Sequence, residues 1–333
     1  KDNPEQLQLY SAQIKTGEIT DISYRGGDYS FQLSNNGRKI VEIFSNYSTP
    51  PDLYWIEASP QSKMNRITVR PDSPLGKPLR KIPKSGTIQN EVTGKPVNYR
   101  VWLPDDFRVN HKYPIIVVLN GADCVAPLTE AWRPECYFKQ WLSDKGYIVV
   151  AVQYTDLRTA IEPADSESFS DPLKIQLADI QAVVKEIGKL QYVDLSRSGI
   201  CGWGYGGYLG TMAMLKCDNI FGVGVAILND FFWSQSSSIY LNYMANLLAN
   251  DQVFRKIDPH NFCYNLRGRL LVIQSASSTL PQLVDAQRLI PELLSIRRPV
   301  DFYLYPWENN PIIRSANQYD MFIKTARFFQ LNL

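Results

Sequence analysis

The sequence predicts an α/β protein in which a doubly wound, mostly parallel sheet follows a small antiparallel β segment. Continuous apolar, β-branched runs, such as residues 113–119, are typical of strands buried on both faces of a parallel sheet. From residue 113 onward, such runs alternate with stretches of helical apolar spacing. Alternation of strand and helix indicates a parallel sheet covered by helices on both faces.

The first 70 residues carry the pattern of short antiparallel strands. Strands are expected at residues 9–14, 29–33, 39–44 and 52–57. The turn Asn36-Gly37 between two of them is a strong hairpin signal. So few strands bury little core, and we expect this segment to be part of something larger. Residues 71–84 are rich in Pro, Lys and Gly, which places a boundary between a β segment of residues 1–75 and a domain of residues 76–333.

The remaining elements follow the same reasoning. Strands are expected at residues 86–102, 113–119, 147–152, 198–201, 222–228, 270–273 and 301–305, and helices at residues 137–145, 172–190, 208–215, 283–290 and 315–330. The helix at residues 172–190 is amphipathic, so one of its faces should cover the sheet.

Composition excludes several classes of function. The chain has 333 residues, a net charge of +2 and no basic run, so we expect no nucleic-acid partner. No apolar run approaches the ~20 residues of a membrane-spanning helix. Two His and five scattered Cys without a C-x-x-C pair predict neither a metal site nor a cofactor. The start at Lys1 without Met suggests a processed or trimmed chain.

The most informative stretch is Gly202-Trp203-Gly204-Tyr205-Gly206-Gly207-Tyr208, between a predicted strand and a predicted helix. Strand, glycine-rich turn and helix form the context of the nucleophile elbow G-x-S-x-G of α/β-hydrolases. Its flanking glycines let strand and helix approach, and its centre adopts a strained backbone. Here the centre is Gly204 rather than Ser, so the elbow has no nucleophile at its tip.

This heptad resembles the Gly-Trp-Ser-Tyr-Gly-Gly-Tyr elbow of the dipeptidyl peptidase IV branch of the prolyl oligopeptidase family. Residues 113–121 are similar to the first core strand of that family's catalytic domain, and residues 192–194 and 305–308 to its approaches to the elbow and to the catalytic His. The strands before residue 71 resemble the end of its β-propeller. The resemblance implies an α/β-hydrolase domain preceded by part of a propeller.

Carried over residue by residue, the resemblance implies that the Ser-His-Asp triad has been lost. Gly204 stands at the nucleophile position, Ser277 (or Ser278, one residue on) at the acid, and Asn310 at the base. The family's oxyanion Tyr falls near Asn120. The Tyr after the nucleophile is kept as Tyr205, whose backbone N–H is expected to remain a candidate oxyanion donor.

Other residues are weak replacements for a triad that needs a nucleophile, a base and a group that orients the base. His111 lies in a polar turn, and His260 lies on the wrong segment, before the strand at residues 270–273. Ser275 and its neighbouring hydroxyls are expected to bond to turn backbone. Cys201 is expected to be buried, with a raised thiol pKa.

The sequence therefore favours a serine-peptidase homologue that is catalytically inactive and has a binding or assembly role. The alternatives are an active serine-type exopeptidase or hydrolase with a displaced site and a purely structural subunit. Phe232 and Trp233 are candidate residues for binding a peptide or protein ligand, and core packing is their simpler interpretation. The resemblance implies an extracytoplasmic location and a homodimer, and Asn46-Tyr47-Ser48 is a glycosylation sequon.

Overall fold

The computed structural model describes residues 8–23, 25–47, 49–68, 82–119, 121, 132, 134–156, 171–228, 251–276, 280–309 and 311–333. The chain divides into two compact units: residues 1–83 with 127–141, and residues 84–126 with 142–333. Each unit has a hydrophobic cluster of its own. The boundary predicted between residues 75 and 76 lies outside the described residues.

The second unit is built on an eight-stranded sheet with the order β14-β13-β12-β11-β9-β10-β8-β7. The strands are β7 (Lys84–Gln89), β8 (Pro96–Trp102), β9 (Tyr113–Leu119), β10 (Ile148–Val152), β11 (Val193–Trp203), β12 (Val223–Ile227), β13 (Arg269–Ser275) and β14 (Val300–Tyr305). β7 and β8 pair antiparallel, β8 pairs antiparallel with β10, and all other neighbours are parallel. The six parallel strands therefore end at one common edge of the sheet, which we call the carboxyl edge.

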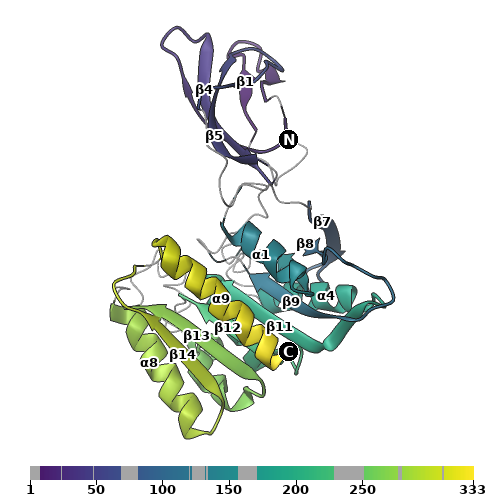
Figure 1. The fold of residues 1–333 in the computed structure, drawn as a ribbon, viewed down its shortest axis with the longest axis vertical. Coiled ribbons are helices and arrows are strands. Elements are labelled where there is room, and N and C mark those ends of the chain that lie inside the picture. The colour runs from purple at the N-terminus through teal and green to yellow at the C-terminus, as the bar shows by residue number, and fades with distance from the viewer. Residues whose placement is uncertain are drawn as a thin grey trace. The chain divides into compact units, whose positions relative to one another are not determined.

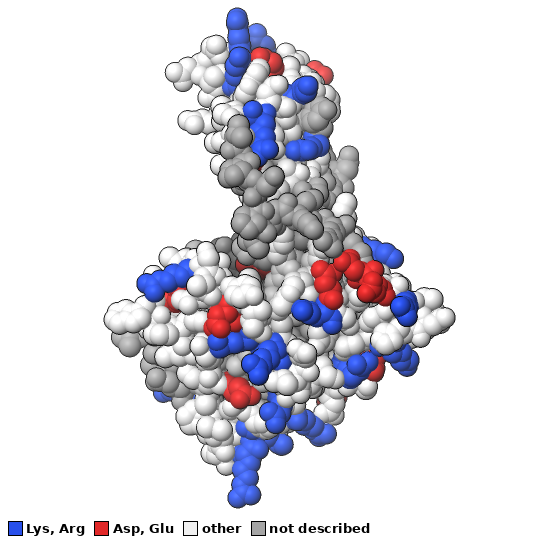
Figure 2. Space-filling view, viewed as in Figure 1, with Lys and Arg blue, Asp and Glu red and all other residues white. Residues whose placement is uncertain are grey.

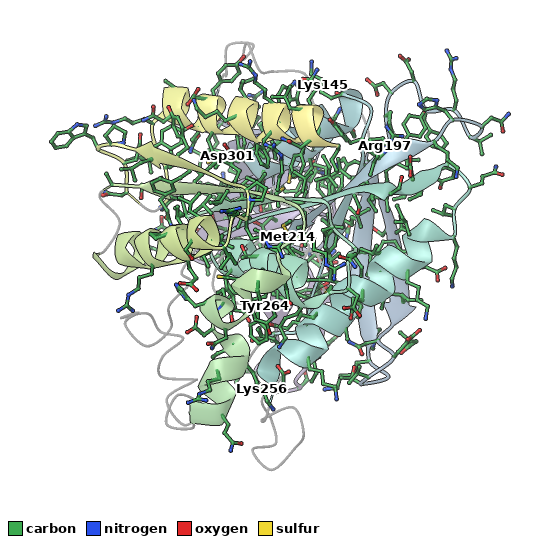
Figure 3. The ribbon with its side chains drawn as sticks, turned by 90° about the horizontal axis from the view of Figure 1, so that it is seen from below. Lys145, Arg197, Met214, Lys256, Tyr264 and Asp301 are labelled. Carbon is green, nitrogen blue, oxygen red and sulfur yellow. The ribbon has the colours of Figure 1, made fainter. Side chains whose placement is uncertain are left out.

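Helices cover both faces of this sheet (Figure 1). They are α4 (Pro172–Gly188), α5 (Tyr205–Lys216), α7 (Asp251–Ile257), α8 (Leu280–Ser295) and α9 (Ser315–Asn332), with the 3₁₀ helix η2 (Pro259–Asn265) before β13. Most of α1 (Pro134–Asp144) belongs to the first unit. Seen along the sheet, α9 lies on one side, and α4, α5 and α8 lie on the other (Figure 3). This is the two-sided covering that the alternation of strands and helices predicted.

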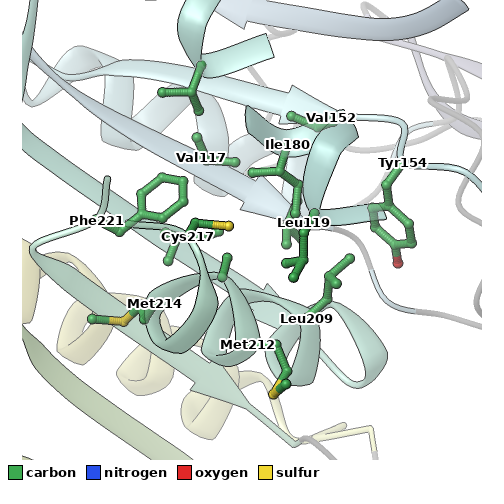
Figure 4. Close-up of a cluster of buried hydrophobic side chains, with 14 of the residues drawn as sticks. Val117, Leu119, Val152, Tyr154, Ile180, Leu209, Met212, Met214, Cys217 and Phe221 are labelled. Atoms are coloured by element: carbon green, nitrogen blue, oxygen red, sulfur yellow. The ribbon is translucent and has the colours of Figure 1, made fainter. Parts of the chain in front are cut away.

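The main core lies where β9, α4 and α5 meet (Figure 4). Val117 and Leu119 of β9 are fully buried and pack with Ile180 of α4 and with Leu209 and Met212 of α5. All of the residues of β9 from 115 to 119 are buried, which explains why this strand reads as an uninterrupted apolar run.

The structure confirms the predicted fold class. The buried strand at residues 113–119 has the predicted bounds. The sequence reasoning missed the short strands β2 (Ile19–Asp21) and β6 (Asn65–Arg66), and also α7 and η2. These elements are too short to show a clear hydrophobic period.

Basic and acidic side chains are interspersed over the visible face of the second unit (Figure 2). This mixture agrees with a net charge of only +2. None of the described helices combines the length and apolar character needed to cross a bilayer.

The first unit contains a four-stranded antiparallel sheet in the order β3-β4-β5-β6, beside the hairpin β1-β2. Its other strands are β1 (Tyr10–Ala12), β3 (Asp28–Leu33), β4 (Lys39–Asn46) and β5 (Thr49–Glu57). The predicted Asn36-Gly37 turn joins β3 to β4, and Gly37 has a φ of 70°. Leu9, Ile22, Ile40 and Ile56 form a small core.

A buried carboxylate interrupts the inward face of β4. Glu42 is 1% exposed between Ile40 and Phe44, and its two oxygens have no hydrogen-bond partner among the described residues. Burial raises the pKa of Glu42 to about 7, although the charge of Arg25 opposes the rise. The guanidinium of Arg25 lies 4.2 Å from the centroid of the Phe44 ring. Glu42 therefore carries its proton at mildly acidic pH.

This burial predicts a pH-dependent stability. Between the unfolded pKa of about 4.3 and the folded pKa of about 7, the native chain holds a proton that the unfolded chain releases. The free energy of unfolding should therefore fall as pH rises through this window and not fall further above it. Glu42→Gln should flatten this slope and raise stability at pH 8.

Urea unfolding at several pH values between 4.5 and 8 checks this expectation. Glu57→Gln is the matched control, because Glu57 lies on the neighbouring strand with an exposed side chain. An equal slope in wild type and Glu42→Gln would show that Glu42 is charged in the folded protein.

Candidate active site

The elbow predicted from the glycine-rich heptad is formed by the end of β11, Gly204 and the start of α5. Gly204 has φ 54° and ψ −124°, a left-handed conformation that side chains disfavour. Its N–H donates to the carbonyl of Ile227 on β12 at 2.8 Å, which anchors the turn to the neighbouring strand. The backbone of a nucleophile elbow is thus intact.

The glycines around this turn are required by close packing of backbone on backbone. A Cβ on Gly202 would lie 2.3 Å from the carbonyl carbon and oxygen of Gly206, and one on Gly206 would lie 2.5 Å from the carbonyl oxygen of Leu119. A Cβ on Gly121, after β9, would lie 1.5 Å from the carbonyl oxygen of Trp203. These positions hold β9, the elbow and α5 together whether or not a nucleophile is present.

Gly204 differs from these glycines. Among the described residues, a Cβ built on it meets only the carbonyl group of Gly121, with its oxygen at 3.0 Å. Space therefore does not exclude a side chain at the tip, although the contact is tight and the positive φ adds strain. The chemistry missing from the tip is the nucleophile itself.

The backbone N–H of Tyr205, the candidate oxyanion donor, already has a partner. It donates to the carbonyl oxygen of Gly121 at 3.3 Å. An oxyanion hole works by aiming preorganised donors at the place where negative charge develops. In this structure the protein's own carbonyl oxygen accepts the bond that a substrate oxygen would accept.

The side chain of Tyr205 connects the elbow to the core. It is 4% exposed, and its hydroxyl donates to Gln176 Oε1 of α4 at 2.5 Å. Gln176 Nε2 in turn donates to the carbonyl of Thr155, which follows β10, at 2.9 Å. Because Tyr205 packs and bonds inward, its side chain serves the structure of the elbow.

A buried aspartate extends this network. Asp179 of α4 is fully buried, accepts from the N–H of Thr155 at 2.6 Å, and accepts a short hydrogen bond from Asn90 Nδ2. Burial raises the pKa of Asp179, and the hydrogen bonds from Asn90 and Thr155 oppose this rise. The cluster ties the end of β7, α4 and the loop after β10 together behind the elbow.

The segment after β14, where the family carries its His, is held by Glu308. This carboxylate is 1% exposed, accepts from the N–H of Ile313 at 3.1 Å and from Asn317 Nδ2 at 2.5 Å, and has Arg314 Nε at 3.8 Å. Desolvation raises the pKa of Glu308, but the bonds from Asn317 and Ile313 outweigh it and hold the pKa below its usual value. The loop is therefore folded back on its own carboxylate.

Several predicted site residues lie outside the described residues. They are Asn120, Phe232, Trp233, Ser277, Ser278 and Asn310. The residues just before Ser277 are described. Ser275 is buried at the end of β13, and the N–H of Ala276 donates to the carbonyl of Tyr305 at 2.9 Å. The ends of β13 and β14 thus lie side by side at the carboxyl edge.

Both histidines are described. His111 is exposed, with its ring 4.5 Å from that of Tyr113. His260 Nδ1 lies 2.7 Å from Asp258 Oδ1, and the same oxygen accepts the N–H of His260 at the start of η2. Sequence reasoning placed His260 on this segment but missed the pairing, for which the Asp-Pro-His spacing at a helix start was the available signal.

The four described cysteines, Cys136, Cys201, Cys217 and Cys263, are all buried, which confirms the burial predicted for Cys201. Desolvation raises the pKa of Cys217 and Cys263 to about 12, so their reactive thiolate forms are rare at neutral pH. Among the described residues, no group of three His, Cys, Asp or Glu side chains could hold a metal ion.

The sheet order, the crossover helices and the strained strand–turn–helix elbow together define an α/β-hydrolase. Among solved structures, the chain is similar to dipeptidyl peptidase 4 of Porphyromonas gingivalis, with a TM-score of 0.84 and 21% identity over 98% of this chain and 46% of that one. At this identity, the likeness establishes the fold.

The chain belongs to the prolyl oligopeptidase family, whose sequence pattern its residues 137–333 match. It is similar to dipeptidyl peptidase 8 of Homo sapiens, with 25% identity over all of this chain and 38% of that protein. It is also similar to prolyl endopeptidase FAP of Bos taurus, with 24% identity over 51% of this chain and 22% of that protein. These relatives confirm the resemblance to the dipeptidyl peptidase IV-like branch. The chain spans less than two fifths of the length of dipeptidyl peptidase 8.

The packing at the elbow predicts opposite outcomes for two glycines one turn apart in α5. Gly206→Ala would press a Cβ against the backbone of Leu119, so it should destabilise the protein by at least about 2 kcal/mol. In Gly210→Ala the nearest atom is a side-chain carbon of Ile200 at 3.5 Å, an ordinary contact. Helix propensity should then make this control neutral or stabilising by up to about 1 kcal/mol.

Thermal and urea unfolding of the two variants tests this difference. Similar stabilities for Gly206→Ala and Gly210→Ala would mean that β9 and α5 are not in the close contact described above.

Proposed function

We propose that this chain is a serine-peptidase homologue that does not hydrolyse peptide bonds and that uses the hydrolase scaffold to bind a peptide or protein ligand. The observation that supports this most strongly is Gly204: the elbow keeps its strained backbone, but its tip has no nucleophile. A serine mechanism needs an oxygen nucleophile, and triad members act as a unit.

The state of the oxyanion donor supports the same proposal. The Tyr205 N–H is bonded to Gly121, so stabilising a tetrahedral intermediate would first require this bond to break. Ser277 and Asn310, which take the acid and base positions by resemblance, add to the argument from sequence. On this proposal the nucleophile, the acid and the base are absent, and the oxyanion donor is already bonded to Gly121.

The alternative is a hydrolase with a displaced site. The Asp258–His260 pair supplies a base oriented by a carboxylate, which is part of what such a site needs. The neighbouring thiol of Cys263 is a poor nucleophile, because its pKa is about 12 and its Sγ donates to the carbonyl of Pro259 at 3.6 Å. This weakens the proposal of a displaced hydrolase site at the Asp258–His260 pair.

The first unit supports a proposal about architecture: its sheet is part of a β-propeller. On the face of β4 and β5 that points away from the small core, Val41 and Ile43 are 42% and 47% exposed, and Leu53 is 37% exposed. Val41 pairs with Trp55 and Ile43 with Leu53, so these side chains share one face. An apolar outer face on central strands is expected where a second sheet packs against it.

We also propose a homodimer and an extracytoplasmic location. β14 is an edge strand whose Phe302 and Leu304 are 40% and 37% exposed, and such edges favour pairing with another chain. The sequon at residues 46–48 agrees with an extracytoplasmic location. Sedimentation velocity of the purified chain tests the dimer, which a purely monomeric species would exclude.

The proposed loss of catalysis predicts that a single substitution does not restore it. Gly204→Ser would place its Cβ 3.0 Å from the carbonyl oxygen of Gly121 in a strained backbone, without the family's Asp and His. We expect no labelling by a fluorophosphonate serine probe and no hydrolysis of dipeptidyl amide substrates above the uncatalysed rate.

Wild type should also remain unlabelled, since the displaced-site alternative predicts labelling of another serine. A labelled peptide from wild type would establish that alternative. Labelling or turnover by Gly204→Ser alone would show that an acid and a base stand elsewhere near the elbow. Circular dichroism of the variant verifies that it is folded.

A further inference from the structure

Residues of positive φ lie at both edges of the sheet, and Gly146, Asn219 and Arg297 precede β10, β12 and β14 at the opposite edge. At the carboxyl edge, three strands are followed closely by a residue of positive φ: Gly204 (54°) after β11, Leu228 (49°) after β12 and Trp307 (62°) after β14. Leu and Trp avoid this conformation because their Cβ crowds the backbone. Residues held in such conformations cluster at binding and catalytic sites.

Of these residues at the carboxyl edge, Trp307 is the one whose strain is not offset by burial of its side chain. Leu228 is 4% exposed, so its burial in the core offsets the strain. Trp307 is 81% exposed, which leaves a large apolar ring in water on a strained backbone. Neither feature stabilises the folded chain, and a glycine at this position would remove both.

The conformation of Trp307 is fixed by its neighbour. Glu308 is buried and bonded to the N–H of Ile313 and to Asn317 Nδ2, so the backbone that follows Trp307 cannot relax freely. On the other side, the carbonyl of Tyr305 accepts the N–H of Ala276 and anchors the end of β14. The indole is therefore presented on a braced segment, as a preorganised binding residue requires.

The place of Trp307 in the sheet and the charges beside it indicate which ligand its indole could contact. β14 and β11 are separated by three strand spacings, which is about 14 Å and matches an extended peptide of about four residues. The Glu308 carboxylate is buried, whereas Arg314 on the same loop is 62% exposed, so the exposed charge there is positive. This disfavours a cationic side chain over the indole, and the apolar face of the indole suits an uncharged ring.

We propose that Trp307 anchors a peptide-binding site along the carboxyl edge, stacking on the Phe or Pro ring of an uncharged, extended peptide. Ligands of open α/β sheets bind outside the carboxyl ends of the strands, which is where Trp307 lies. The inference rests on the proposed ligand-binding function and adds the anchoring residue and the class of side chain that it takes.

The test uses the full chain labelled with 5-fluorotryptophan and observed by ¹⁹F NMR. Trp307→Phe removes one resonance and so assigns it. Titration with the probe acetyl-Gly-Gly-Phe-Gly-amide should shift the Trp307 resonance saturably. Substituting Gly or Lys for Phe in the probe should weaken binding.

Matched variants separate stacking from general effects. Trp307→Ala should weaken binding of the Phe probe about tenfold, as measured by calorimetry, whereas Trp307→Phe should retain most of it. Tyr319→Ala is the control, because Tyr319 is a comparably exposed aromatic residue of α9 (69%) and should leave the affinity unchanged. Trp307→Gly should lose binding while its Tm stays at or above that of wild type, since glycine relieves the strain.

Four results would overturn the proposal. The first two are the absence of a saturable shift up to about 5 mM probe and equal affinities of wild type and Trp307→Ala for the probe. The third is a Tm of Trp307→Gly several degrees below that of wild type. The fourth is a change of oligomeric state in Trp307→Ala, which would make this surface an interface between copies of the chain. Fluorophosphonate labelling of wild type would contradict the proposed function instead, without altering the peptide affinities, so the two failures are distinguishable.

Discussion

The second unit depends on the close approach of three backbone segments: the end of β9, the elbow after β11 and the first turn of α5. Gly121, Gly202 and Gly206 each lie where a Cβ would overlap a neighbouring main chain. These contacts position β11 beside β9 in the sheet and fix the direction in which α5 leaves it. They are contacts of backbone with backbone, so the scaffold needs no triad side chain to hold it together.

The sequence predicted the fold well and the site only in outline. The run at residues 113–119 defined β9 because a strand buried on both faces leaves an unbroken apolar signal. The glycine heptad located the elbow because its spacing is imposed by local geometry. By contrast, the Tyr205–Gly121 hydrogen bond joins backbone groups 84 positions apart in sequence, and backbone groups are the same for every residue type. No pattern of side chains could have revealed it.

The same distinction applies to the carboxylates and to Trp307. Glu42 alternates with Ile40 and Phe44, so its inward direction was readable, but its raised pKa comes from burial in the folded unit. Glu308 could be read only as a charged residue after a strand. Its role as a brace requires the loop to return and place Ile313 and Asn317 against it. The left-handed backbone of Trp307 follows from that return, so it too was invisible in the sequence.

The bond from Tyr205 to Gly121 bears on whether the proposed loss of catalysis could be reversed. The oxyanion donor of an active hydrolase must be available to a substrate oxygen, and a buried N–H without a protein partner costs free energy. Under the proposed loss of catalysis, nothing selects for that cost, and a carbonyl that accepts the N–H stabilises the fold. A serine introduced at Gly204 would therefore still need the hydrogen bond between Tyr205 and Gly121 to break before the N–H could serve a substrate.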